Sequence, residues 1–95
     1  MKNSKEIAIL WSNYMMYRLE LRGFNQKQVE KILRYSVERY YDVETQRMVV
    51  IGRHDDRLVM IPYEQKINTV TPVTIHSISR QLIKLRLKSR RFTNE

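Results

Sequence analysis

The chain has 95 residues, enough for a single domain (1–95) with one modest core, and we expect residues 1–8 to be flexible. It is 42% apolar and 29% charged, which is typical of a globular protein, and its lack of cysteine excludes disulfides and cysteine-bound zinc. The net charge of +8 is uneven, because residues 1–64 hold 11 basic and 9 acidic residues (+2) and residues 65–95 hold 7 basic and 1 acidic (+6).

The first third of the chain predicts a helical hairpin. Ser12 or Asn13 is suited to cap a first helix, and Gly23 is suited to end it in the left-handed conformation. Asn25 is expected to cap a second helix over residues 26–34. One face of this second helix is apolar and consists of Val29, Ile32 and Leu33.

The pattern then changes to that of β-strands. Short polar turns separate four segments rich in aromatic and β-branched residues: 35–43, 47–53, 58–63 and 67–78. Pro62 lacks an N–H donor and is expected at a strand end or on an edge, and the last segment is expected to be interrupted or redirected at Pro72. These local connections predict an α+β fold in which two N-terminal helices pack on a four-stranded, mainly antiparallel sheet.

The C-terminal segment has the most concentrated charge. Between residues 80 and 91 there is no acidic residue and there are six basic ones: Arg80, Lys84, Arg86, Lys88, Arg90 and Arg91. Apolar residues alternate with them at strand period, whereas the helix propensities and an N-cap at Ser79 favour a helix, so a basic helix or strand is expected here. Because clustered positive charges repel one another, the segment is expected to bind a polyanion; six phosphate contacts with single-stranded RNA would give a slope of roughly −4 in log K against log salt.

Two short motifs carry a resemblance to a known family. Residues 12–24 have the sequence S-N-Y-M-M-Y-R-L-E-L-R-G-F, and residues 50–53 have V-I-G-R. The first is similar to the helix motif S-x-H-A-x-x-R-x-x-x-R-G-I of a widespread family of small bacterial proteins, and the second to a strand of that family. Residues 73–80 are similar to the end of BrnT-type toxins. The chain therefore resembles BrnT-like proteins, which are related to the RelE/ParE-like toxin fold.

The resemblance implies a cytoplasmic, RNA-binding toxin of a toxin–antitoxin system, with metal-independent cleavage of messenger RNA as its activity and an acidic antitoxin as its partner. Tyr14 stands where the family has a histidine, and a phenol is a poor base at neutral pH. A non-catalytic nucleic-acid-binding or protein-interaction module on the same scaffold is therefore the alternative. The oligomeric state is left open between a monomer and a homodimer.

Metal-free RNA cleavage requires a base for the 2′-hydroxyl, positive charge for the phosphate and an acid for the leaving oxygen. His76 is the candidate acid or base, with Arg53 and Arg80 as phosphate stabilisers. The alternative is that His76 points to solvent. His54, which precedes two aspartates, is expected to be a solvated turn residue.

Arg18 and Arg22 lie four residues apart and share a helix face. They are candidate RNA ligands together with Lys84, Arg86, Lys88, Arg90 and Arg91. Alternatively, they pair with Glu20 or Glu38 or cover the sheet with their apolar stems. Most of the six tyrosines are expected to fill the core, with base stacking as the alternative role.

We expect no metal, no cofactor and no membrane partner; an anionic membrane surface is a weaker alternative for the basic segment, since Phe92 is the one bulky aromatic residue near it. Two histidines and no cysteine are too few for a typical structural zinc site. The apolar run Ile7–Trp11 is too short for a signal-peptide core or a membrane span, so we expect a soluble protein.

Overall fold

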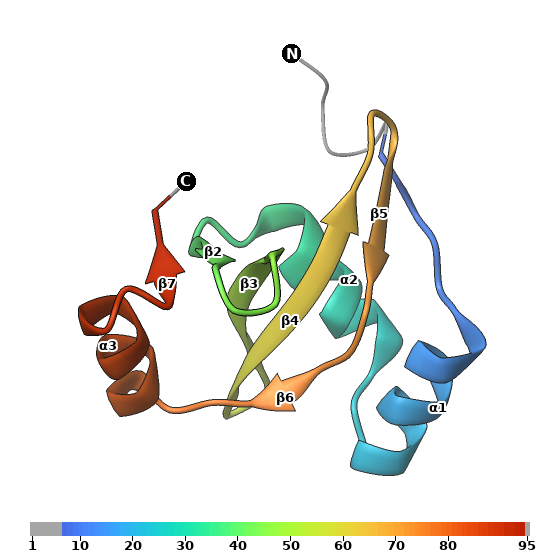
Figure 1. The fold of residues 1–95 in the computed structure, drawn as a ribbon. Helices are drawn as coiled ribbons and strands as arrows, with labels where there is room; N and C mark the ends of the chain where they lie inside the picture. Colours follow the sequence, from blue (N-terminus) through green and yellow to red (C-terminus); the bar gives the residue numbers. More distant parts are fainter. Residues whose placement is uncertain (1–6, 95) are drawn as a thin grey trace.

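Three helices and seven strands form the part of the chain described by the computed structural model, residues 7–94 (Figure 1). The helices are α1 (Asn13–Arg22), α2 (Gln26–Tyr35) and α3 (Arg80–Lys88). The strands are β1 (Ala8–Ile9), β2 (Arg39–Asp42), β3 (Arg47–His54), β4 (Arg57–Gln65), β5 (Thr69–Pro72), β6 (His76–Ser77) and β7 (Phe92–Thr93). The expected α+β class is confirmed.

Each helix begins at a side chain that caps it. The Ser12 hydroxyl accepts the Met15 N–H at 3.0 Å, the Asn25 side chain accepts the Gln28 N–H at 3.1 Å, and the Ser79 hydroxyl accepts the Leu82 N–H at 3.1 Å. After α1, Gly23 has a φ of 71°, which only glycine adopts at little cost. The basic C-terminal segment is a helix, so its alternating pattern was outweighed by propensity and capping. Across residues 7–94, no helix combines the length and apolar character needed to cross a membrane.

The strands form one mixed sheet in the order β1-β5-β4-β3-β2-β7, with β6 also paired to β4. Seven strands are present instead of the four expected. The segment 67–78 is divided into β5 and β6, and β1 and β7 are strands of two residues at the two edges. The first expected strand begins later than predicted, because α2 continues through Tyr35. Of the stretch expected to be flexible, residues 1–6 lie outside the described residues, while Ala8 pairs in parallel with Thr69.

Pro62 lies inside β4, a central strand, so its expected place at a strand end or edge was wrong. Its carbonyl accepts a hydrogen bond from the Val73 N–H at 2.8 Å. Since the N–H and C=O groups of a strand residue point to the same side, the missing donor of Pro62 faces the break between β5 and β6. The sheet tolerates the proline because the neighbouring chain makes no regular ladder there.

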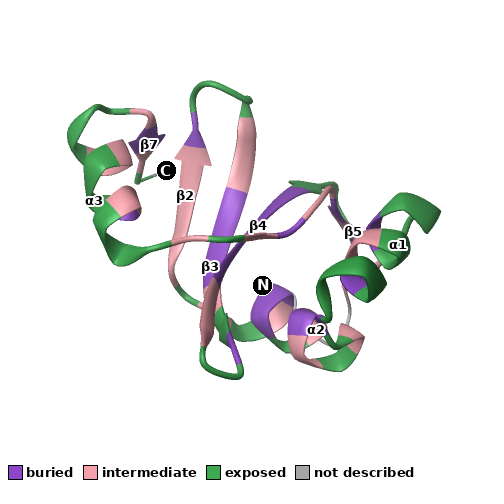
Figure 2. Ribbon diagram, turned by 90° about the horizontal axis from the view of Figure 1, so that it is seen from below, coloured by how far each residue is buried: buried purple, intermediate pink, exposed green. Residues whose placement is uncertain are grey.

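The two faces of the sheet support two separate cores (Figures 1 and 2). On one face, α1 and α2 bury their apolar residues against Val50, Val59, Ile61 and Tyr63. On the other face, Ile83 of α3 and Phe92 of β7 pack on Val49, Ile51 and Met60. Alternate residues of β3 and β4 thus point to opposite cores, as the two-residue period of a strand requires.

Candidate nucleic-acid interface

Two arginines of the basic C-terminal segment are bound to acidic residues of the segment around β2. Arg80 Nη1 lies 2.6 Å from a Glu38 carboxylate oxygen. This hydrogen bond and the positive charge of Arg80 lower the pKa of Glu38. Arg91 donates to both carboxylate oxygens of Asp42, at 3.0 and 3.1 Å, and lies 3.4 Å from Glu44. The expectation that these cations repel one another without an acidic neighbour was therefore wrong, because the fold supplies the acids from a distant segment.

Burial disfavours ionisation of Asp42, which is only 2% exposed. The Arg91 hydrogen bonds and charge, together with the Glu44 N–H, outweigh this effect and hold the pKa of Asp42 below its ordinary value. Asp42 and Arg91 therefore join β2 to the end of the C-terminal segment as a charged, hydrogen-bonded pair.

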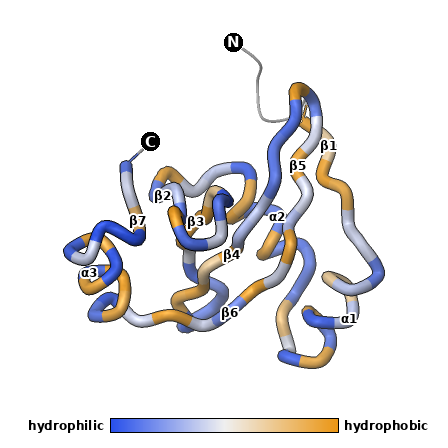
Figure 3. The backbone as a smooth tube through the Cα atoms, in the orientation of Figure 1, coloured by the Kyte–Doolittle hydropathy of each residue, from blue (hydrophilic) through white to orange (hydrophobic). Residues whose placement is uncertain are grey.

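The other four basic residues of this segment differ in their surroundings. The Arg86 guanidinium lies 5.4 Å from the Phe92 ring centroid, and burial followed by repulsion from Arg91 lowers its pKa. Lys84, Lys88 and Arg90 are exposed, and no ion pair within residues 7–94 involves them. In Figure 3, α3 alternates between hydrophobic and hydrophilic stretches, as expected for a helix with one face on the sheet.

A groove of about 390 Å³ lies along α3 beside β4 and β6. Its basic lining consists of Arg47, His76, Arg86 and Arg91. Thr45, Thr74 and Ser77 also line it, and Asp42 is the one carboxylate in the lining. Lys84 and Lys88 lie on the exposed side of α3 and do not line the groove.

His76 is half-buried in this groove and lies in a field of positive charge. Burial lowers its pKa, and the charges of Arg18, Arg22 and Arg86 lower it further. The alternative in which His76 simply points to solvent does not hold. The fold therefore brings the two arginines of the N-terminal motif within electrostatic reach of a residue on β6.

Arg18 and Arg22 do not form the ion pairs with Glu20 or Glu38 that were one alternative for them. Glu38 is occupied by Arg80, and no salt bridge in the described part of the chain includes either α1 arginine. The Nε of Arg18 is buried and has no hydrogen-bond partner among residues 7–94. These two guanidinium groups are therefore charges that the described fold leaves without an acidic neighbour.

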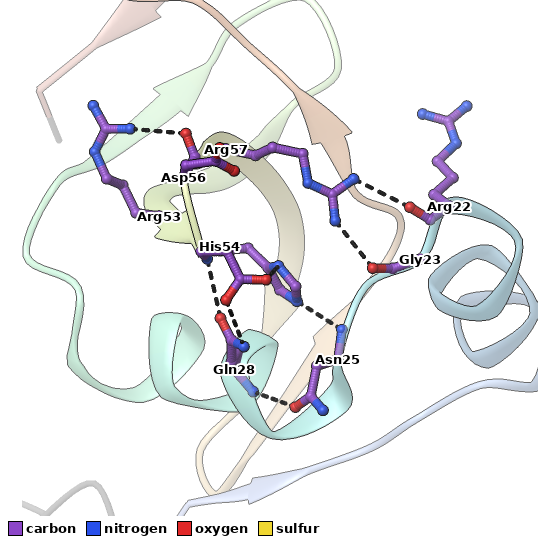
Figure 4. A network of polar contacts seen from close by, with 9 residues as sticks. Arg22, Gly23, Asn25, Gln28, Arg53, His54, Asp56 and Arg57 are labelled. Carbon is purple, nitrogen blue, oxygen red and sulfur yellow. Dashed lines mark hydrogen bonds and ion pairs between the residues drawn. The ribbon is translucent and has the colours of Figure 1, made fainter.

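The three candidate catalytic residues do not line one groove. His76 does line it, whereas Arg80 and Arg53 are absent from its lining. Arg53 donates to the Asp56 carbonyl at 3.3 Å within the β3–β4 hairpin (Figure 4). It borders a separate hollow with Lys31. The groove thus combines His76 with Arg86 and Arg91 in place of the expected pair.

His54 was expected to be a solvated turn residue, and this was wrong. It is 1% exposed, and its Nε2 accepts the Asn25 N–H at 2.6 Å (Figure 4). In this contact the ring nitrogen Nε2 is the acceptor. Its ring meets Phe24 edge-on at 5.0 Å. His54 therefore joins the β3–β4 hairpin to the start of α2.

Arg57 holds the neighbouring end of α1 (Figure 4). It donates to the carbonyls of Arg22 and Gly23 at 3.2 and 3.0 Å, and its guanidinium lies 4.0 Å from the Phe24 ring centroid. Sequence reasoning missed this role. These contacts join residues that are 34 and 35 positions apart in the chain, so no local sequence pattern predicts them.

The expectation that most tyrosines fill the core was only partly right. Tyr63 is 2% exposed, and Tyr40 is half-buried and stacks on Phe92. Tyr14, Tyr17 and Tyr35, by contrast, are exposed to more than half of their surface. Three large aromatic side chains therefore stand outside the two cores.

A comparison of the chain with models of known protein families gave no match, and comparisons with curated proteins and with solved structures gave none either. Within residues 7–94, no group of three or more histidine or acidic side chains is placed to hold a metal ion. What the groove offers a ligand is positive charge, hydroxyl groups and one imidazole.

Proposed function

We propose that this protein is an RNA-binding protein of the RelE/BrnT-like toxin class that holds RNA phosphates in the groove around His76. The observation that carries the proposal is the unbalanced positive charge around His76, which comes from Arg86 in the groove lining and from Arg18 and Arg22 of α1 outside that lining. Arg18, Arg22 and Arg86 all depress the pKa of His76, and no ion pair among residues 7–94 engages any of these three. A bound phosphate would relieve this repulsion.

Guanidinium groups suit this ligand. Their planar set of N–H donors matches two phosphate oxygens at once, and Ser77 adds a hydroxyl-bearing side chain to the same groove. A phosphate beside His76 favours its protonated form, so RNA binding and proton uptake are coupled. The proposed interface therefore differs from a solvated charged face, which would show no such coupling.

The order of the elements also supports this class. Two successive helices, then strands joined by short connections, is the order that the sequence resemblance implies, and the elements from α1 to β6 follow it. In this proposal the four longer strands, β2 to β5, correspond to the four-stranded sheet of that family. RNA as ligand places the protein in the cytoplasm, and an acidic antitoxin is the protein partner whose charge complements the groove.

Cleavage of messenger RNA is a second candidate function. The lowered pKa of His76 favours it, because a neutral imidazole at physiological pH is ready to act as a base. Binding without cleavage is the better supported of the two. Arg53 and Arg80 lie outside the groove lining, and the carboxylate that lies there, Asp42, is ionised and held by Arg91.

Fluorescence anisotropy with a labelled single-stranded RNA tests the proposal. Contacts of Arg18, Arg22, His76 and Arg86 with four phosphates predict a slope of about −3 in log K against log salt. Affinity that is absent, or that does not depend on salt, would contradict the proposal. A gel assay of the same RNA separates the two candidate functions, since cleavage that His76→Ala abolishes would establish the ribonuclease.

A further inference from the structure

We propose that the exposed tyrosines of α1 form a platform on which unpaired RNA bases stack, beside the phosphate-binding groove. The proposal rests on the proposed RNA-binding function and deepens it. Tyr14, Tyr17 and Leu21 are 54%, 59% and 62% exposed. Their spacing of three and four residues places them in one stripe, and the residues that α1 buries are Met15 and Leu19.

Within residues 7–94, this stripe belongs to neither of the two cores. Figure 2 shows α1 as largely exposed, with its buried residues confined to the side that faces the sheet. Tyrosines that serve the fold behave differently: Tyr63 is buried, and its hydroxyl accepts a hydrogen bond from Arg39 at 3.1 Å. Single exposed apolar side chains are common on protein surfaces, but a continuous stripe along a helix marks a binding surface.

Charge complementarity identifies the occupant. The Arg18 guanidinium lies 5.6 Å from the Tyr14 ring centroid, and Arg22 follows one turn later on the same side of α1. Both arginines act on His76 in the groove. Aromatic rings and guanidinium groups therefore lie side by side on α1, and the guanidinium charges reach His76 in the groove.

An unpaired nucleotide has the matching groups. Its base offers a flat face that stacks on a phenol ring or a guanidinium plane. Its phosphate carries the negative charge that would pair with the two arginines. A base in a duplex hides both faces against its neighbours, so the platform selects single-stranded RNA.

The test uses the full chain and three labelled probes of equal length: a single-stranded RNA, the same strand without its bases, and an RNA duplex. We expect the single strand to bind about tenfold more tightly than the abasic strand and the duplex. Tyr14→Leu and Tyr17→Leu are expected to remove most of this preference while leaving the abasic affinity and its salt slope unchanged. Because both side chains are exposed, the variants should keep the wild-type thermal stability.

Two matched variants control for side effects. Tyr35→Leu removes an equally exposed tyrosine (58%) on α2 and is expected to leave the preference intact. Tyr14→Phe keeps the ring without the hydroxyl and is expected to keep stacking. A Phe variant that loses the preference as fully as the Leu variant would overturn the platform.

The failure of the platform and the failure of RNA binding give different results. Equal, salt-dependent affinity for the single and abasic strands would overturn the platform and leave the groove proposal standing. Absence of binding to all three probes would overturn both. A self-association in sedimentation experiments that Tyr17→Leu abolishes would assign the stripe to a second copy of the chain and overturn the platform.

Discussion

The two faces of the sheet are covered by different kinds of contact. On the first face, α2 packs through Val29, Ile32 and Leu33, and a Cβ atom placed on Gly52 would lie only 2.6 Å from Ile32 Cγ2. On the second face, α3 buries only Ile83 completely, and ion pairs to the β2 region hold the segment at both ends. Close apolar packing secures one face, and charge pairing supplements a smaller core on the other.

This difference decides which arginines are available to a ligand. Arg80 and Arg91 belong to the most basic stretch of the sequence, yet both are bound to carboxylates. Arg18 and Arg22 belong to a region of nearly balanced charge, yet no ion pair in residues 7–94 includes them. The density of charge along a sequence therefore does not measure the charge that a surface offers.

The largest effect is expected at the pair that anchors the second face. Asp42→Asn leaves Arg91 without its buried partner and should lower the free energy of unfolding by about 3 kcal/mol, less than for a pair buried on both sides because Arg91 is 26% exposed. Urea denaturation measures the change. Glu64→Gln, which breaks the exposed pair with Arg47, is the control and should cost about 0.5 kcal/mol or less. Equal losses would show that the two faces are not secured differently.

The stabilisation from Asp42 should also depend on pH. Since the pKa of Asp42 is lowered in the folded state, its contribution is fully present above the unfolded pKa and is lost as pH falls through the folded pKa. The wild type and Asp42→Asn should therefore converge in stability in acid.

The next effect tests the close packing on the first face. Gly52→Ala should lower the free energy of unfolding by about 2 kcal/mol, because the new methyl group would lie too close to the Ile32 side chain. Combination with Ile32→Ala makes room for that methyl group. The double variant should therefore lose less stability than the sum of the two single losses. A loss in the double variant equal to the sum of the two single losses would contradict the close contact between Gly52 and Ile32.

A smaller effect distinguishes the arginines of α1 from the lysines of α3. Arg18→Gln with Arg22→Gln should weaken RNA binding by about tenfold, whereas Lys84→Gln with Lys88→Gln, which removes the same charge, should weaken it about twofold. Anisotropy at one fixed salt concentration gives both numbers. Equal losses would mean that net charge, and not the groove, determines affinity.

The smallest expected effect concerns His76. The pKa of His76 is lowered in the free protein, and bound RNA favours the protonated ring. The affinity for RNA should therefore rise a few-fold as pH falls toward that lowered pKa. Folding responds in the opposite sense: the stability that neutral His76 confers is present above the unfolded pKa of histidine and is lost as pH falls toward the folded one. His76→Gln should flatten the pH dependence of binding; an unchanged profile would remove His76 from the interface.

Local structure was predictable because its causes are local. Ser12, Asn25 and Ser79 cap helices at the expected positions, since a cap depends on residues only three positions apart. The strands β1 and β7 were not predicted, because two-residue segments show no periodicity and their partners Thr69 and Asp42 lie far along the chain. Pro62 was misplaced for the same reason: only the course of residues 73–75 shows that its position needs no donor.

The candidate site was predictable in its parts but not in its assembly. His76, Arg86, Arg18 and Arg22 were each selected from the sequence, and the fold brings them within reach of one another. Arg53 and Arg80 were selected by the same reasoning, but they are absent from the groove lining and are not among the charges that lower the pKa of His76. Pairing with Glu38 and Asp42 decides which cations are neutralised, and such pairing depends on strand order, which no single segment encodes.

The sequence alone determined the α+β class, the capped helices and the excess of positive charge, because residue type and short-range spacing are enough to produce them. The tertiary structure decided how that charge is distributed. It paired Arg80 and Arg91 with carboxylates that hold α3 to the sheet, and it buried His54 between the β3–β4 hairpin and α2. It left Arg18 and Arg22 outside every ion pair of residues 7–94 and left Tyr14 and Tyr17 exposed. Electrostatic and packing energies depend on distances between side chains, and only the folded chain sets those distances.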